Sequence, residues 1–373
     1  MSSAWAHRAD SRANRIGAQL TRLPVLVEAS RGPAVGSEIR HAGAIAVVDG
    51  EGNLMAGVGD VNAVFPLRST TKPIQLLPYL LDGLHRDRPR AGQELLPDLA
   101  VMMSSHAGEL MHTQRVSGIL QAYGLSPQAL LCGAHWPYSA AARNALIRGD
   151  ESPGNLHSNC SGKHTGMLAV CVRNGWPLES YVDAEHPLQR RINSIVAVLS
   201  RSRRTPLPHS VDGCSLPTHW VTMRGLAHMY AALAYPEGAP EVEQRPIGEE
   251  LELLFTAGTR HPEMVAGNGF FDTRLMTSFG GRVLAKGGAA GVYAMAVAPT
   301  NAFPHGLGIA FKVEDGDGDA RARPIIACEI LRQLNIAPEN KATAESLEAL
   351  AGATVLNVRR MRVGEYRCLF QLR

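Results

Sequence analysis

The sequence lacks the features of several common protein classes. No apolar run approaches the roughly 18 residues of a membrane span, and the first residues contain no apolar signal-peptide core. The six cysteines stand at irregular spacings that do not suggest a disulfide framework. The net charge of +3 is too small to indicate nucleic-acid binding, and we interpret short clusters such as Arg201, Arg203 and Arg204 as solvated faces. We therefore expect a soluble cytoplasmic protein that binds neither nucleic acid nor membrane.

Several catalytic motifs are also missing. The G-x-S-x-G elbow of α/β-hydrolases, the H-E-x-x-H zinc motif and the P-loop are all absent from the sequence. Lysine is scarce, since only five of the 37 cationic side chains are lysines. Arginine can supply charge equally well, but only lysine loses its proton readily when it is buried. The five lysines are therefore candidates for proton chemistry.

Strands are expected at both ends of the 373-residue chain and helices between them. The expected strands are 25–29, 44–48, 54–58, 283–285, 293–297, 308–313 and 366–372, with a further strand near residue 211. The expected helices are 109–123, 161–174, 186–203 and 325–334. This pattern predicts an α/β fold of the α+β type, with a mixed or antiparallel sheet from both chain ends and a helical middle region. We divide the chain into a flexible arm (1–20), a sheet domain (21–68 and 280–373) and a mainly helical region (69–279).

The segment Ser69-Thr70-Thr71-Lys72 has the S-x-x-K form. A spacing of three residues directs both side chains to one face of a helical turn, where a buried lysine could take the proton from the serine hydroxyl. Pro73 restrains the backbone before it, so the helix is expected to begin near Thr71 with Ser69 in the preceding turn. Taken alone, the same pattern also fits a helix-capping hydroxyl beside an exposed lysine.

Two further segments have matching chemistry. Lys286-Gly287-Gly288 follows an expected strand and resembles the K-[ST]-G element of serine–lysine acyltransferases, although a simple glycine turn has the same form. Ser105 follows the apolar run 99–103 and could relay a proton or hold a substrate, or simply cap a turn.

A group of sulfur and nitrogen side chains opens the helix expected at 161–174. Cys160, Lys163 and His164 stand at i, i+3 and i+4 and share one face, and Asp212 and Cys214 follow further along the chain. These residues could bind zinc if the fold brings them together. Buried free cysteines are also common as plain core residues.

Taken together, the motifs resemble those of the rhizobial-type L-asparaginases, also called the class 3 or asparaginase II family. The matching segments are Arg68–Pro73, Ser104–Glu109, Asn159–Met167, Asp212–Ser215 and Lys286–Gly288. They stand in the family's order and span most of the chain after residue 20. Ser158 departs from the family pattern, where a second asparagine is expected.

The resemblance implies a fold similar to serine β-lactamases and penicillin-binding proteins, and a homodimer. It also implies two Ser–Lys pairs, Ser69 with Lys72 and Ser105 with Lys286. The zinc ligands that it implies are Cys160, Lys163 and Cys214, and the supporting residues are Arg68, His164, Asp212 and Gly287.

The expected activity is hydrolysis of L-asparagine to L-aspartate and ammonia through a Ser69 acyl-enzyme. Lys72 would act as the base, and Ser105 and Lys286 would relay protons or orient the substrate. The backbone N–H of Ser69 and one near Gly287 would form an oxyanion hole. Zinc is expected to bind without being the hydrolytic centre. The alternatives are a penicillin-recognising carboxypeptidase or β-lactamase-like hydrolase and a non-enzymatic zinc-binding protein, and the choice between L-asparagine and L-glutamine remains open.

Overall fold

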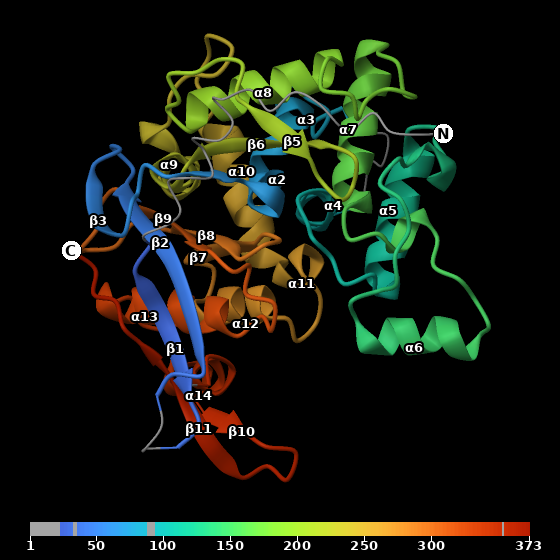
Figure 1. The fold of residues 1–373 in the computed structure, drawn as a ribbon. Coiled ribbons are helices and arrows are strands. Elements are labelled where there is room, and N and C mark those ends of the chain that lie inside the picture. Colours follow the sequence, from blue (N-terminus) through green and yellow to red (C-terminus); the bar gives the residue numbers. More distant parts are fainter. Residues whose placement is uncertain (1–22, 33–35, 88–93, 353) are drawn as a thin grey trace, which may run out of the picture.

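The structure is a computed structural model that describes residues 23–32, 36–87, 94–352 and 354–373. An eight-stranded sheet, built from both ends of the chain, forms its centre (Figure 1). The strands run in the order β10-β11-β1-β2-β9-β8-β7, β3 pairs with β2 outside this path, and all the pairings are antiparallel. The strands are β1 (Val25–Ser30), β2 (Ile39–Asp49), β3 (Leu54–Val58), β7 (Val283–Gly287), β8 (Val292–Val297), β9 (Leu307–Val313), β10 (Thr354–Leu356) and β11 (Arg362–Cys368).

The two central strands of the C-terminal half are covered on both faces. Every residue of β8 and β9 is buried, and β9 pairs with β2 in a register that sets Ile45 against Phe311. Strands buried on both faces have nearly continuous apolar sequences rather than alternating ones. The run Leu-Gly-Ile-Ala-Phe-Lys-Val of β9 has this character.

The predicted fold class is confirmed, because strands from both chain ends form one antiparallel sheet and helices fill most of the middle. The helix predicted at 161–174 is present as α7 (Ser161–Asn174) and ends at Gly175, whose φ of 64° is the left-handed conformation that glycine tolerates best. The expected arm, 1–20, lies outside the described residues. The domain boundaries near residues 68 and 280 stay a prediction.

One part of the helical middle was predicted wrongly. A second, three-stranded sheet has the order β4-β6-β5 and consists of β4 (Val64–Pro66), β6 (Pro217–Thr222) and β5 (His209–Val211). The strand near residue 211 was expected, but β6 was not. Its sequence runs directly into the helix α9 (Met223–Ala234), so the short extended stretch is hidden by the helical apolar spacing that follows.

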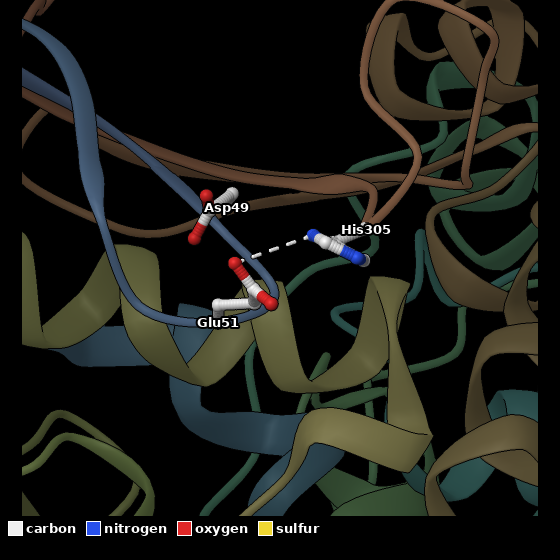
Figure 2. Close-up of side chains that lie close together, drawn as sticks. All are labelled: Asp49, Glu51 and His305. Atoms are coloured by element: carbon white, nitrogen blue, oxygen red, sulfur yellow. Dashed lines mark ion pairs between the residues drawn. The ribbon is translucent and has the colours of Figure 1, made fainter.

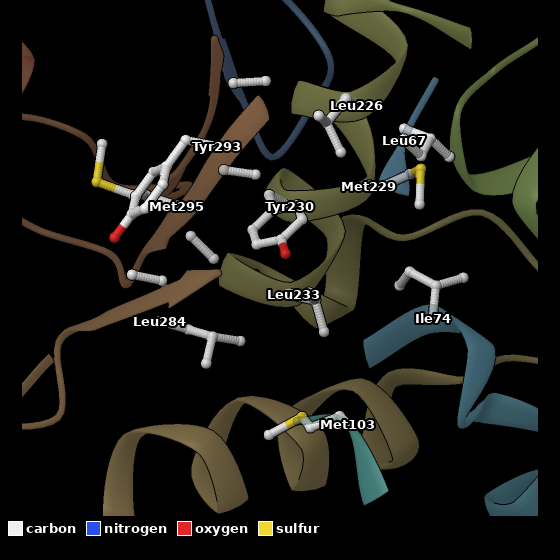
Figure 3. Close-up of a cluster of buried hydrophobic side chains, with 14 of the residues drawn as sticks. Leu67, Ile74, Met103, Leu226, Met229, Tyr230, Leu233, Leu284, Tyr293 and Met295 are labelled. Carbon is white, nitrogen blue, oxygen red and sulfur yellow. The ribbon is translucent and has the colours of Figure 1, made fainter. Parts of the chain in front are cut away.

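Helix α9 packs on β2, β8 and β9. Its apolar side chains Leu226, Met229, Tyr230 and Leu233 meet residues of the sheet and of the segment around Ile74 (Figure 3). The close approach depends on Gly308 of β9, where a Cβ atom would lie 1.9 Å from the Ala227 carbonyl oxygen. The Tyr230 hydroxyl donates to the Thr70 carbonyl at 2.9 Å, which ties the S-x-x-K segment to this core.

Helices α4 (Leu95–Met102) and α7 pack against each other just as closely. A Cβ atom on Gly162 of α7 would lie 2.0 Å from the Val101 carbonyl oxygen, so only glycine fits there. This contact brings the first turn of α7 against the end of α4. Residues after α4 and residues opening α7 therefore share one region of the molecule.

Further α-helices of the middle and late parts of the chain are α3 (Leu77–Leu81), α5 (Leu110–Ala122), α6 (Ala140–Arg148), α8 (Pro187–Leu199), α10 (Gly248–Arg260), α11 (Pro262–Val265), α12 (Phe271–Ser278), α13 (Ala322–Gln333) and α14 (Lys341–Leu350). None of the helices in the described ranges combines the length and the apolar character that crossing a membrane requires.

We predict that Gly308→Ala lowers the free energy of unfolding by about 3 kcal/mol or more, because the new methyl group would overlap the α9 backbone. Gly318→Ala is the matched control, since a Cβ atom there meets nothing within 4 Å. Chemical denaturation of both variants measures the difference. Equal stability of the two variants would contradict the close approach of α9 to β9.

Candidate active site

The loop after α4 and the end of β7 meet the S-x-x-K segment at one serine hydroxyl. Lys72 Nζ donates to Ser105 Oγ at 2.9 Å, and Lys286 Nζ donates to the same oxygen at 2.8 Å. Both lysines are 1% exposed. The structure therefore brings Lys72, Ser105 and Lys286 into one hydrogen-bonded chain, with the Ser105 oxygen between two amines.

Ser69 lies in the 3-10 turn η2 (Arg68–Thr71), directly before the short helix α2 (Lys72–Gln75). This agrees with the expectation that Ser69 stands in the turn before the helix. Lys72 Nζ makes no hydrogen bond to Ser69, however. Besides Ser105 Oγ, it donates to the carbonyl oxygens of Ser104 at 2.5 Å and Asn159 at 3.3 Å. Within the described ranges the half-buried Ser69 hydroxyl has no hydrogen-bond partner.

The backbone before Ser69 is held in an uncommon conformation. Arg68 has a φ of 50°, which few residues other than glycine adopt. Its N–H donates to Thr218 Oγ1 at 2.9 Å, and its guanidinium pairs with Asp212 Oδ1 at 2.9 Å. Gly288 lies against the same turn, since a Cβ there would come 3.3 Å from the Thr70 methyl group. The turn that presents Ser69 is thus fixed from β6 and from the end of β7.

Burial changes the acidity of both lysines. Burial lowers the pKa of Lys286 to about 7, and the nearby Lys72 amine lowers it further while Asp272 opposes the shift. The pKa of Lys72 is lowered by burial, although the neighbouring Cys160 opposes this. An amine with a pKa near neutrality can exchange protons with a hydroxyl at physiological pH. Lys286 is therefore better suited to act as the base than Lys72, which was expected from the sequence to take that role.

Asp272 is a functional residue that sequence reasoning missed. Its carboxylate accepts hydrogen bonds from the Gly287 N–H at 2.8 Å and from the Tyr293 hydroxyl at 2.9 Å, which fixes it close to Lys286. It stands in the first turn of α12, and no motif or spacing connects it with Lys286 in the sequence. Only the packing of α12 on β7 reveals the pair.

The expected oxyanion hole stays a prediction, but two backbone N–H groups near Gly287 cannot contribute to it. The Gly287 N–H donates to Asp272, and the Gly288 N–H donates to the Val292 carbonyl at 2.8 Å. Neither group is available to stabilise a developing negative charge. The glycines instead allow β7 to turn closely against the S-x-x-K segment.

A sulfur–amine cluster adjoins this chain. Lys163 Nζ lies 3.2 Å from Cys214 Sγ, the Cys160 and Cys214 side chains form a hydrogen bond, and all three residues are buried. The hydrogen bond from Cys214 holds the pKa of Cys160 well below its ordinary value, and the same bond raises the pKa of Cys214. Burial alone would lower the pKa of Lys163, but the charges of Cys214, Cys160 and Asp212 outweigh burial and raise it. A thiolate at Cys160 thus balances the Lys163 ammonium.

This donor set fits zinc. Two sulfur atoms and an amine nitrogen converge in a buried position, and thiolates are ligands that zinc prefers. The Lys163 amine would have to lose its proton to bind the metal. Lys72 also hydrogen-bonds with Cys160, so the cluster and the Ser105 chain are in direct contact.

His164 lies beside the cluster but bonds elsewhere. Its Nδ1 lies 2.6 Å from the Tyr181 hydroxyl, and its buried Nε2 has no partner among the described residues. Burial, with the Lys163 and Lys72 charges, lowers the pKa of His164 well below its ordinary value, so the ring is neutral. Ser158, the departure from the family pattern, is buried and accepts weakly from the Cys160 N–H at 3.5 Å.

A second group of possible ligand side chains lies far along the sheet. Asp49, Glu51 and His305 have ligand atoms within 4.8 Å of one another (Figure 2). Asn53 already donates two hydrogen bonds to Asp49, and Arg201 donates to the Glu51 carbonyl at 3.0 Å. These contacts close the turn between β2 and β3, and the neighbouring guanidinium disfavours a cation there.

The sequence matches the family model described as L-asparaginase II over residues 27–368. No curated protein matches it significantly. A probable glutaminase from Bacillus subtilis complexed with 6-diazo-5-oxo-L-norleucine is 13% identical, with 90% of this chain and 99% of that chain covered and a TM-score of 0.40. A β-lactamase from Mycobacterium bovis is 15% identical, with coverages of 78% and 94% and a TM-score of 0.38. Likeness at this level is too weak to indicate a function.

Proposed function

The chain belongs to the L-asparaginase II family and is an amidohydrolase of a small-molecule amide, and we propose that it hydrolyses L-asparagine to L-aspartate and ammonia through an acyl-enzyme on Ser69. The observation that carries this proposal is the convergence of the buried Lys72 and Lys286 amines on Ser105 Oγ. Two amines on one hydroxyl form a path along which a proton can move. Such a path is what the formation and breakdown of an acyl-enzyme require.

The catalytic roles of Ser69 and Ser105 follow from their different hydrogen bonds. The Ser105 hydroxyl is held between two amines, with Lys72 Nζ at 2.9 Å and Lys286 Nζ at 2.8 Å from its oxygen. Ser69 Oγ is half-buried and has no bond within the described part of the chain, so its lone pairs are free to attack a substrate. We therefore assign nucleophilic attack to Ser69 and proton transfer to Ser105.

The reaction proceeds in two balanced steps. Ser69 Oγ forms a bond to the side-chain amide carbon, and its proton passes to the amines through Ser105, which requires the two hydroxyls to come into contact when the substrate is bound. The C–N bond then breaks, the nitrogen takes up a proton, and ammonia leaves. Water attacks the resulting ester by the same route and releases L-aspartate. Lys286, whose pKa is about 7, is the neutral partner before the attack.

The Arg68–Asp212 pair fits the other end of an amino-acid substrate. The guanidinium and the carboxylate are 28% and 15% exposed, so both can be reached. Asparagine carries an α-carboxylate and an α-ammonium group, which match these charges. L-Glutamine has the same charged groups, so the length of the side chain, not this pair, would select between the two amides. A homodimer stays a prediction from the resemblance.

We predict that Ser69→Ala lowers kcat by about 10⁴-fold, as removal of a nucleophile typically does. A diazo ketone analogue of L-asparagine should label Ser69 in the unaltered protein and, more slowly, in Ser105→Ala. Trypsin places the two serines on different peptides, because Arg86 and Arg90 lie between them and Arg115 follows Ser105. Mass spectrometry of the peptides therefore identifies the labelled residue.

Ser194→Ala is the control, since this serine lies on the exposed side of α8. Label on the Ser105 peptide, or near-normal ammonia release by Ser69→Ala, would overturn the assignment. Labelling by penicillin instead would favour the β-lactamase-like alternative, and a protein that binds zinc but releases no ammonia would favour the non-enzymatic one.

We also propose that Cys160, Lys163 and Cys214 hold a zinc ion that is not the hydrolytic centre. Bound zinc would supply a fixed positive charge beside the substrate site. The three ligands would anchor the first turn of α7 to the loop before β6, and through Lys72 they would hold the amine chain in position.

One zinc per chain is therefore expected by elemental analysis, and it should be lost in Cys160→Ser and Cys214→Ser. Cys328→Ser, which alters a half-buried cysteine outside the cluster, should keep it. Stripping the metal should raise KM more than it lowers kcat. A kcat that falls to background and returns only with added zinc would show instead that the metal is catalytic.

A further inference from the structure

Four arginines line one cavity beside β6. Arg201, Arg203 and Arg204 lie in the segment after α8, and Arg224 lies in the first turn of α9. They surround a cavity of about 570 Å³ that has no aspartate or glutamate in its lining. The interpretation of the Arg201–Arg204 cluster as a solvated face is therefore incomplete.

These arginines are not neutralised. Within the described residues none of the four forms an ion pair with a carboxylate. Arg201 donates to the Glu51 carbonyl at 3.0 Å and Arg224 to the Gly52 carbonyl at 3.1 Å. Neutral carbonyls fix the two guanidinium groups in position without cancelling their charge. The cavity lining therefore carries a net positive charge, which the Asp49 carboxylate near His228 offsets only in part.

A buried histidine with an unused nitrogen lines the same cavity. His228 of α9 is 8% exposed, and its buried Nδ1 has no hydrogen-bond partner among the described residues. Burial, then Arg201 and Arg224, lower the pKa of His228 to about 4, while Asp49 opposes the shift. An orphaned polar atom in a buried position is costly, and an anion in the cavity would supply the missing partner.

An aromatic ring completes the lining. Trp220 of β6 faces the cavity, and its Nε1 donates to Ser210 Oγ at 3.0 Å, which fixes the indole plane. A fixed indole is a surface on which a planar ring can stack. The volume lies within the range of small-molecule sites.

We propose that this cavity binds a small phosphate-bearing molecule of nucleotide size. Guanidinium groups bind phosphate oxygens in pairs through their planar N–H forks, and the Trp220 ring offers a place for the base. The site is distinct from the Lys72–Ser105–Lys286 chain and does not depend on the proposed amidase activity. Strand β6 connects the cavity with the active site. Its Thr218 accepts a hydrogen bond from the Arg68 N–H, and its Trp220 lines the cavity.

Isothermal titration of the full chain with AMP, inorganic phosphate and adenosine tests the proposal. The variant is Arg203→Gln/Arg204→Gln, because neither of these exposed side chains makes a hydrogen bond in the described structure and the fold should be unaffected. The control is Arg148→Gln/Arg260→Gln, which removes the same charge from exposed positions on α6 and α10.

AMP should bind with one site per chain, and adenosine should not bind. The double variant should weaken AMP binding by about tenfold or more, as expected for lost charge-assisted hydrogen bonds, while the control is unchanged. Tighter binding of AMP than of phosphate would identify a nucleotide, and equal affinities would identify the phosphate ion itself. No binding of either compound at millimolar concentration, equal binding of adenosine and AMP, or equal losses in variant and control would overturn the proposal.

Discussion

The hydrogen bonds from two buried amines to Ser105 Oγ are the interaction on which the site depends. Burying even one lysine is costly in an apolar interior, because the charged form loses its hydration. Here Lys72 and Lys286 are both almost fully buried, each beside a hydroxyl and backbone carbonyl oxygens. Those carbonyls come from the loop after α4, the segment before α7 and the end of β7. The fold therefore has to bring three distant segments together for the lysines to be tolerated at all.

The surrounding charges act differently on the protonation of the two amines. Burial lowers the pKa of Lys72, but two carbonyl acceptors and the Cys160 sulfur favour its ammonium form and oppose this shift. Burial and the Lys72 charge lower the pKa of Lys286 to about 7, although Asp272 and Cys160 oppose the shift. One charged amine and one neutral amine on the same hydroxyl can move a proton in either direction. The sulfur–amine cluster is thus part of the electrostatics of the site whether or not a metal is bound.

Sequence reasoning succeeded where local chemistry decides the structure. The helix α7 was predictable from its apolar spacing, and the expected strands 44–48 and 54–58 are present within β2 and β3. It failed where packing decides. The strand β6 is too short to show a period beside α9, and Asp272 meets Lys286 only because α12 packs on β7. The S-x-x-K spacing suggested that Lys72 bonds to Ser69, but the loop after α4 supplies Ser105 as its partner instead.

The central claim is that a neutral Lys286 amine accepts the proton, and the pH dependence of ammonia release from L-asparagine tests it most directly. The account predicts that kcat/KM rises with pH through an apparent pKa near 7 as Lys286 deprotonates. Asp272 raises the pKa of Lys286, so Asp272→Asn should move this rise to lower pH. A rate that does not change between acidic and alkaline pH, or a rise that moves to higher pH in Asp272→Asn, would contradict the account.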